Sequence, residues 1–185
     1  MNFFKKLFGS SVSPSEDEQK EAEGKEFDVL KYDGMRAFKT GETAFAIECF
    51  RHALRLQEDL EVRDYLSQAL IQSNELLKAY DELQKLADAE PDNIQIVIRM
   101  AHVAYMMENY TVMGDACERG KLLDKDNVDI NYLYARACLG MGDLVNTIAM
   151  LTKTISLDED YVSAYQLRGE TLLKMGDVEG ADADV

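Results

Sequence analysis

The sequence predicts an all-α protein of the α-solenoid class, in which antiparallel helix-turn-helix repeats stack on one another. Two prolines and eleven glycines in 185 residues are few for a turn-rich β fold and suit a chain of helices. A long apolar residue followed by Gly and Asp occurs in "LGMGDLVNTIAML" and again in "LLKMGDVEGA". The glycines of the two stretches, Gly142 and Gly176, are 34 residues apart, a spacing typical of repeat architectures.

The composition describes a folded, acidic protein. A hydrophobic fraction of 46% is ordinary for a folded chain. The formal net charge of −15 repels phosphates and removes the counterion release that drives general nucleic-acid binding, and no basic run exceeds Lys5–Lys6. We therefore expect no nucleic-acid partner, and interpret the acidity as a solvated surface that keeps the protein soluble.

The cysteines and hydropathy point to a cytoplasmic protein. Cys49, Cys117 and Cys138 have neither CxxC spacing nor nearby His pairs, which fits reduced, buried thiols and predicts no metal site. No apolar run approaches the roughly 20 residues that a membrane-spanning helix needs.

Residues 1–26 differ in composition from the rest and are expected to form a flexible N-terminal segment. Its tip, "MNFFKKLFG", lacks the apolar core of a secretory signal. If residues 1–8 were helical, Phe3, Phe4, Leu7 and Phe8 would share one side, with the lysines at its polar boundary. This segment could be disordered, contact a membrane surface, or dock onto a protein; the Ser, Glu and Lys-rich stretch that follows is too polar to form a core.

The repeats begin at Phe27. An aspartate follows each apolar helical run, with spacings of 33, 34 and 34 residues, at Asp59, Asp92, Asp126 and Asp160. Asp and Asn oxygens accept the unpaired N–H groups of a helix's first turn, so these positions are expected to cap the next helix. The predicted repeats are 27–59, 60–93, 94–127, 128–161 and an incomplete 162–185.

A second break divides each repeat into two helices, at Gly41, Asn74, Glu108, Gly142 and Gly176. Gly and Asn tolerate the left-handed backbone that ends a helix, whereas Glu does so less readily, so we expect Asn109 to replace Glu108 in this role. First helices carry a small residue at one place, where a facing helix could approach closely: Gly34, Ser67, Ala101, Ala135 and Gly169. Second helices carry an apolar residue at theirs: Phe50, Leu83, Cys117 and Leu151.

These residues resemble the tetratricopeptide repeat (TPR), a helix–turn–helix of 34 residues. The resemblance covers residues 27–185 and is best in "AYQLRGETLLKMGDVEGA", at Ala164, Tyr165, Gly169, Leu172, Gly176, Asp177 and Ala181. It implies a right-handed superhelix whose concave face is lined mainly by first helices. Where the pattern asks for alanine, the third and fourth repeats carry Met113, Gly120, Thr147 and Thr154, so these repeats are expected to pack less tightly.

The resemblance also implies which side chains face the groove. They are Lys31, Met35 and Phe38 in the first repeat, Tyr65 and Gln68 in the second, Ile98, Arg99, His102 and Tyr105 in the third, and Tyr132, Arg136 and Leu139 in the fourth. Tyr and Arg are enriched among interface hot spots, so this mixed surface predicts an extended or helical peptide ligand. Some aromatic residues are instead expected to fill the seam between repeats, as for Tyr134 and Tyr165.

Some TPR proteins hold the acidic tails of chaperones in a carboxylate clamp. This chain resembles that clamp at Lys31 and Arg99, but Met35, Tyr65 and Gln95 occupy its other polar positions. We therefore expect Arg99 and Arg136 to meet a different acidic or C-terminal group.

An enzyme is not expected. His52 and His102 have no triad partners or HExxH spacing, and no phosphate-binding loop is present. The predicted function is a non-enzymatic adaptor or scaffold that binds a peptide segment of a protein in the concave groove and needs no cofactor. The alternatives are a chaperone-like protein that shields a client, or a membrane-proximal assembly component. An open apolar edge at the last repeat could pair two chains, so a monomer or a weak homodimer is expected.

Overall fold

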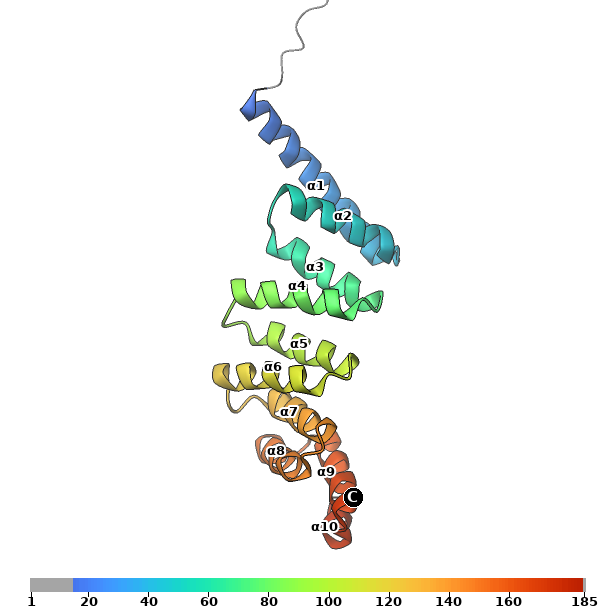
Figure 1. Cartoon of the computed structure of the whole chain (residues 1–185), viewed down its shortest axis with the longest axis vertical. Coiled ribbons are helices and arrows are strands. Elements are labelled where there is room, and N and C mark those ends of the chain that lie inside the picture. The colour runs from blue at the N-terminus through green and yellow to red at the C-terminus, as the bar shows by residue number, and fades with distance from the viewer. Residues whose placement is uncertain (1–14, 185) are drawn as a thin grey trace, which may run out of the picture. The chain divides into compact units, whose positions relative to one another are not determined.

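The computed structural model describes residues 15–184, and every regular element in that range is an α-helix (Figure 1). The predicted all-α helical-repeat fold is confirmed. The chain divides into two compact units, Met1–Val62 and Arg63–Val185, called here the N-terminal and C-terminal units. The tip proposed at residues 1–8 lies outside the described residues.

The N-terminal unit begins with a longer helix than expected, α1 (Glu16–Thr40). Ser15 caps it: its hydroxyl accepts from the Glu18 N–H at 3.3 Å, and the Glu18 carboxylate accepts from the Ser15 N–H at 2.9 Å. A Lys25–Glu21 ion pair of 2.7 Å adds support one turn later. The prediction of a flexible segment is therefore wrong for residues 16–26, because their polar side chains favour a capped helix even without burial.

Close packing joins α1 to α2 (Thr43–Leu56). A Cβ atom on Gly34 would lie 2.6 Å from Cε1 of Phe50, so only glycine allows this approach without movement. The two helices turn at Gly41, whose φ of 83° is left-handed. The expected close approach at the small residue of the first helix is confirmed here. The buried side chains of the pair include Phe27, Ala37, Ala46, Ile47, Cys49, Phe50 and Ala53.

Asp59 fastens the start of α3 (Leu60–Gln72) to α1. Its carboxylate accepts from the Val62 N–H at 2.8 Å and from Lys31 Nζ at 3.0 Å, while Lys31 also lies 2.7 Å from Glu61. Burial alone would raise the pKa of Asp59, but the Val62 N–H and Lys31 prevail, so that pKa lies below its ordinary value. Asp59 caps a helix as predicted.

In the C-terminal unit the remainder of α3 is followed by seven helices among the described residues: α4 (Leu76–Ala89), α5 (Ile94–Met106), α6 (Tyr110–Leu123), α7 (Val128–Gly140), α8 (Leu144–Leu157), α9 (Val162–Met175) and α10 (Val178–Asp182). The pairs α5–α6, α7–α8 and α9–α10 pack as hairpins, and α4, α6 and α8 each pack against the next first helix. A nearly buried ion pair between Arg63 and Glu82 links α3 to α4. The second helices α6 and α8 are therefore each shared by two first helices.

In this unit the turn within the third repeat and the helix caps between repeats differ from the predictions. Glu108 adopts the left-handed conformation itself, with φ of 54°, and Asn109 instead caps α6 by accepting from the Val112 N–H. Between repeats, Asn93 and Asn127 cap α5 and α7, one residue after the predicted aspartates. The predicted capping role of Asp92, Asp126 and Asp160 is wrong because the helices begin one residue later, after Asn93, Asn127 and Tyr161.

The residues that replace alanine in the third and fourth repeats are buried against their neighbours. Met113, Thr147 and Thr154 are completely buried. The two threonine hydroxyls donate to backbone carbonyls one turn earlier, at 2.7 and 2.9 Å, so their polarity is satisfied inside the helix. A Cβ on Gly120 would lie 2.5 Å from Cδ1 of Ile130, which shows how closely α6 and α7 approach.

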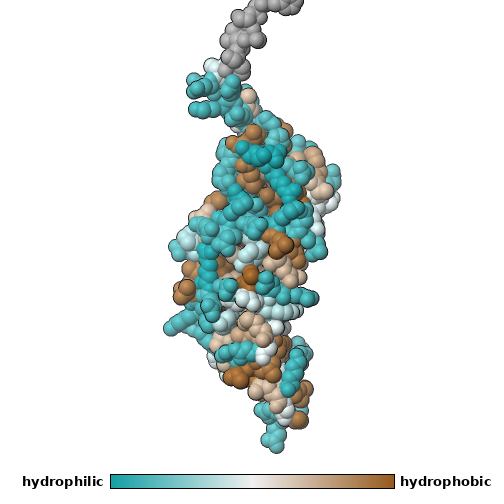
Figure 2. Space-filling model, in the orientation of Figure 1, coloured by the Kyte–Doolittle hydropathy of each residue, from teal (hydrophilic) through white to brown (hydrophobic). Residues whose placement is uncertain are grey.

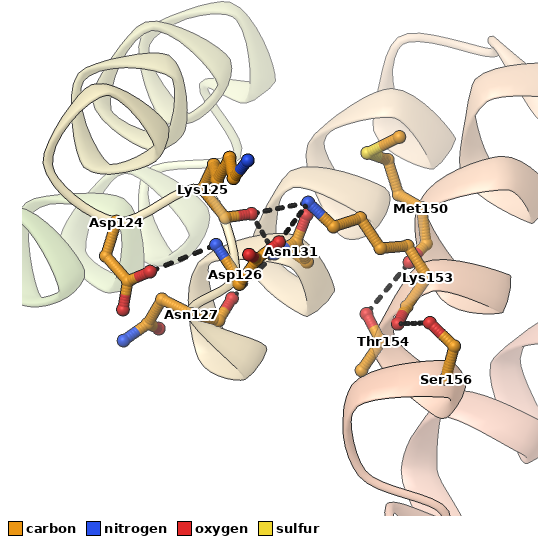
Figure 3. A network of polar contacts seen from close by, with 9 residues as sticks. All are labelled: Asp124, Lys125, Asp126, Asn127, Asn131, Met150, Lys153, Thr154 and Ser156. Carbon is orange, nitrogen blue, oxygen red and sulfur yellow. Dashed lines mark hydrogen bonds and ion pairs between the residues drawn. The ribbon is translucent and has the colours of Figure 1, made fainter.

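Basic side chains reinforce the stacking from the second helices. Lys153 of α8 donates to the Lys125 carbonyl at 2.5 Å and lies 3.1 Å from Asp126, in the loop before α7 (Figure 3). Arg119 of α6 similarly donates to the Ala87 carbonyl at 2.5 Å. Arg119 and Lys153 are 34 residues apart, but their acceptors differ in position, since Ala87 lies in α4 and Lys125 lies in the loop before α7.

Asp59→Ala should destabilise the protein by about 1 kcal/mol at pH 7, since it removes a helix cap and a partner of Lys31. Asp59→Asn is the matched control, because its amide oxygen can still accept from Val62, and it should lose less. A depressed folded-state pKa contributes stability above the unfolded value of about 3.9 and loses it as the pH falls through the folded pKa. Urea unfolding followed by circular dichroism should therefore show that the loss of unfolding free energy in Asp59→Ala becomes smaller in acid. A loss that stays the same in acid would contradict this role of Asp59.

Two glycines of α6 should respond to alanine with opposite signs. Gly114→Ala should stabilise by up to about 1 kcal/mol, because alanine favours a helix and the new Cβ would meet nothing closer than 3.7 Å. Gly120→Ala should instead destabilise by about 1 kcal/mol or more, since buried Ile130 must move. Urea unfolding measures both changes, and Ile130→Val should partly restore the Gly120→Ala protein. Equal effects at the two glycines would mean that this contact does not limit the stacking.

Candidate protein-binding surface

The predicted ligand-contacting residues divide between the two units. Lys31, Met35 and Phe38 lie on α1 in the N-terminal unit, and the others lie on α3, α5 and α7. We call most of the second group, together with one acidic neighbour, the first-helix surface. It consists of Asp64, Tyr65, Gln68, Arg99, His102, Tyr105, Tyr132 and Arg136.

At one end of this surface Arg99 is already paired. Its Nη1 lies 2.5 Å from Oδ1 of Asp64, and Gln68 donates to the other Asp64 oxygen at 2.9 Å. The side chains of Arg99 and Asp64 are each about one-third exposed, so the pair is accessible but its charges offset each other. Sequence reasoning missed Asp64, although its separation of 35 residues from Arg99 is close to one repeat.

At the other end Arg136 lies over two aromatic rings. Its Cζ lies 3.8 Å from the ring centroid of Tyr105 on α5 and 5.9 Å from that of Tyr132 on α7. A guanidinium over an aromatic face is attracted by the ring quadrupole while its N–H groups stay able to donate in the plane. The structure thus brings Tyr105, Tyr132 and Arg136 together from two successive repeats.

Arg136 also differs from every other arginine of residues 63–184. Arg63, Arg99, Arg119 and Arg168 each have a carboxylate within 4 Å, whereas Arg136 has none among the described residues. The Arg136 side chain is half-buried, so part of its solvation has already been lost. Like every arginine it has five N–H donors, and among the arginines of this unit its positive charge is the least compensated by carboxylates of the protein.

The rings beside Arg136 are held by further packing. Tyr132 lies 4.9 Å from Tyr161, centroid to centroid, and Tyr105 meets Tyr110 edge-on at 6.2 Å. Burial, with the negative charge of Asp129 adding to it, raises the pKa of Tyr161 to about 12, so its phenol remains neutral at physiological pH. The surface around Arg136 is therefore built on rings that packing holds in place.

Other predicted residues have different roles. Ile98 is only 8% exposed, so its prediction as a groove-facing residue is wrong; it points from α5 into the core. His102 is exposed, and Met35, Phe38, Tyr65 and Leu139 are half-buried. Lys31 is engaged by Asp59 and Glu61.

Two tyrosines fill seams between repeats, as predicted. Tyr165 packs against a buried cluster that includes Ala135 and Leu151. Tyr134 donates to Glu118 at 2.9 Å and has Lys121 4.4 Å from its ring centroid. These rings join neighbouring helices and are not free for a ligand in the same way as Tyr105.

The chaperone-tail clamp is not preformed in this chain. Both of its matching cations, Lys31 and Arg99, are neutralised by carboxylates of the protein itself. Met35 and Tyr65 offer no amide at the remaining positions. Arg136, one repeat further along, is therefore the basic residue of the first-helix surface that stays available to an acidic group.

The described residues offer neither a reactive thiol at Cys117 nor a group of metal ligands. Burial raises the pKa of the Cys117 thiol to about 12, which leaves little thiolate at neutral pH. Within residues 15–184, no three His, Cys, Asp or Glu side chains are grouped to hold a metal ion. No helix in this range combines the length and the apolar character needed to cross a membrane. Hydrophilic residues cover much of the visible face, with hydrophobic residues in smaller patches between them (Figure 2).

Comparison with known proteins places the fold but not a family. No family model matches the chain, and no curated protein matches it. The structure is similar to a crystal structure of MamA protein, with a TM-score of 0.77, 19% identity, and coverage of 87% of this chain and 88% of that one. It is also similar to MamA 41-end from Desulfovibrio magneticus RS-1, with a TM-score of 0.75, 18% identity, and coverage of 86% and 90%. At these identities the likeness establishes a shared helical-repeat fold alone.

Proposed function

We propose that this protein is a protein-interaction module that binds a peptide segment of a partner on the first-helix surface. The observation that carries the proposal is Arg136, half-buried between Tyr105 and Tyr132 with no carboxylate partner among the described residues. Arg and Tyr dominate interface hot spots because each buries a large area and keeps directional hydrogen bonds. Packing fixes these side chains in advance, so a ligand would pay little entropy to order them.

The helical-repeat fold supports the same role. The Arg99–Asp64 pair links α5 to α3, and α5 packs against α7, which offers an extended surface to a peptide. The likeness to MamA supports this architecture, while the binding role rests on the side chains of this chain. An adaptor or scaffold needs no group beyond those present on this surface.

Tyr105→Ala combined with Arg136→Gln should abolish partner capture. Truncation of hot-spot residues typically costs about 2 kcal/mol or more each, enough to lose a partner in a pull-down. Immobilised protein would be incubated with native lysate, and bound proteins identified by mass spectrometry. The matched control is Lys78→Gln, which removes one positive charge from α4, where the Lys78 side chain is 60% exposed.

The double variant, Tyr105→Ala with Arg136→Gln, should keep the helical circular-dichroism signal. The Lys78→Gln control should keep the partners of the unmodified protein. Capture by the double variant at the level of the unmodified protein would place the binding site elsewhere on the chain.

A further inference from the structure

We infer that the peptide bound on the first-helix surface presents a single carboxylate, which pairs with the guanidinium of Arg136 between the rings of Tyr105 and Tyr132. This inference rests on the proposed function and names the chemistry of its partner. The carboxylate could belong to an Asp or Glu side chain or to a chain terminus, since both offer the same two oxygens to an arginine.

The case for a carboxylate starts from the state of Arg136. It is half-buried, so the protein has already removed part of its water, and no carboxylate among residues 15–184 compensates the charge. The other four arginines of residues 63–184 all have such a carboxylate. A planar guanidinium donates two parallel N–H bonds to a carboxylate, and this geometry is compatible with ring stacking above and below its plane.

Asp64 is the reason to expect only one carboxylate on the bound peptide. Arg99 lies on the same surface, but Asp64 takes its charge and Gln68 occupies the second Asp64 oxygen. A second acidic group of the peptide would have to displace this internal pair. Asp64 thus acts as a specificity-determining residue that reduces two arginines on the surface to one available guanidinium.

The charge of the whole chain agrees with recognition by direct contact. With a net charge of −15, the protein's field repels acidic segments at long range. A peptide rich in acidic residues, or a phosphate dianion, would be repelled more strongly than a peptide with one carboxylate. The favoured ligand is therefore a mainly apolar or neutral segment with one acid, whose neighbours contact the tyrosine rings.

The probes for the test are peptides from two random dodecamer libraries displayed on phage, one with free C-termini and one with both ends internal. Each library is selected against the full chain, and enriched peptides are synthesised with a fluorophore for polarisation titrations. Enrichment of one Asp or Glu in both libraries identifies a side-chain carboxylate as the ligand. Enrichment confined to the free C-terminus library identifies a terminal carboxylate.

The expected result is a loss that is not additive between protein and peptide. Arg136→Gln should weaken binding by about tenfold or more, and replacing the peptide's acid with Gln, or amidating its terminus, should do the same. The two changes together should cost no more than either alone, because they remove one interaction. The control is Lys78→Gln, which removes an exposed positive charge of α4 outside the first-helix surface and should alter the affinity by less than about threefold.

A second variant tests the role of Asp64. Asp64→Asn releases Arg99, so a peptide carrying a second acidic residue should bind this variant about threefold to tenfold more tightly than it binds the unmodified chain. Circular dichroism of each variant should match that of the unmodified protein. An unchanged affinity would overturn the assignment of Asp64.

Two failures are distinguishable. Peptides that lose binding on Tyr105→Ala but show no preference for an acid, or bind Arg136→Gln equally well, would overturn this inference and leave the proposed function standing. The absence of any enriched peptide, or binding unaffected by both Tyr105→Ala and Arg136→Gln, would overturn the proposed function and this inference together.

Discussion

The covering of each helical hairpin by the next is the constraint on which the C-terminal unit depends. A hairpin alone leaves one apolar side in water, and in this unit α4, α6 and α8 bury that side against α5, α7 and α9. The contact of Gly120 with Ile130 sets how closely two repeats approach. Lys153 of α8 donates to the Lys125 carbonyl of the preceding repeat (Figure 3), and Arg119 of α6 donates to the Ala87 carbonyl of the repeat before its own.

This stacking also creates the first-helix surface. Successive first helices lie side by side, so Asp64 can reach Arg99 and Tyr105 can reach Arg136, each across one repeat. In the first contact the negative charge of Asp64 offsets the positive charge of Arg99 within the protein. The second contact joins a cation to a neutral ring, which stabilises the guanidinium without using its hydrogen-bond donors. The difference between these two contacts explains why one arginine is available to a partner and the other is not.

The repeat period made much of the fold predictable, because Gly142 and Gly176 mark turns that few other residues tolerate. The helix at residues 16–26 was missed because a polar composition is shared by disordered segments and capped surface helices. Ile98 was misplaced since a projection onto an ideal repeat is uncertain by one residue, enough to move a side chain from groove to core. The residue types of the candidate surface follow from the sequence, but ion pairs such as Arg99–Asp64 depend on distances that spacing alone does not supply.

We propose that a partner peptide lies across α5 and α7 with a carboxylate on Arg136. A crystal structure of the full chain with a selected peptide would decide this. We expect a peptide carboxylate oxygen within about 3 Å of the Arg136 guanidinium, with Asp64 still paired to Arg99. A peptide bound along the second helices, or one whose acid contacts Arg99 while Arg136 faces solvent, would contradict it.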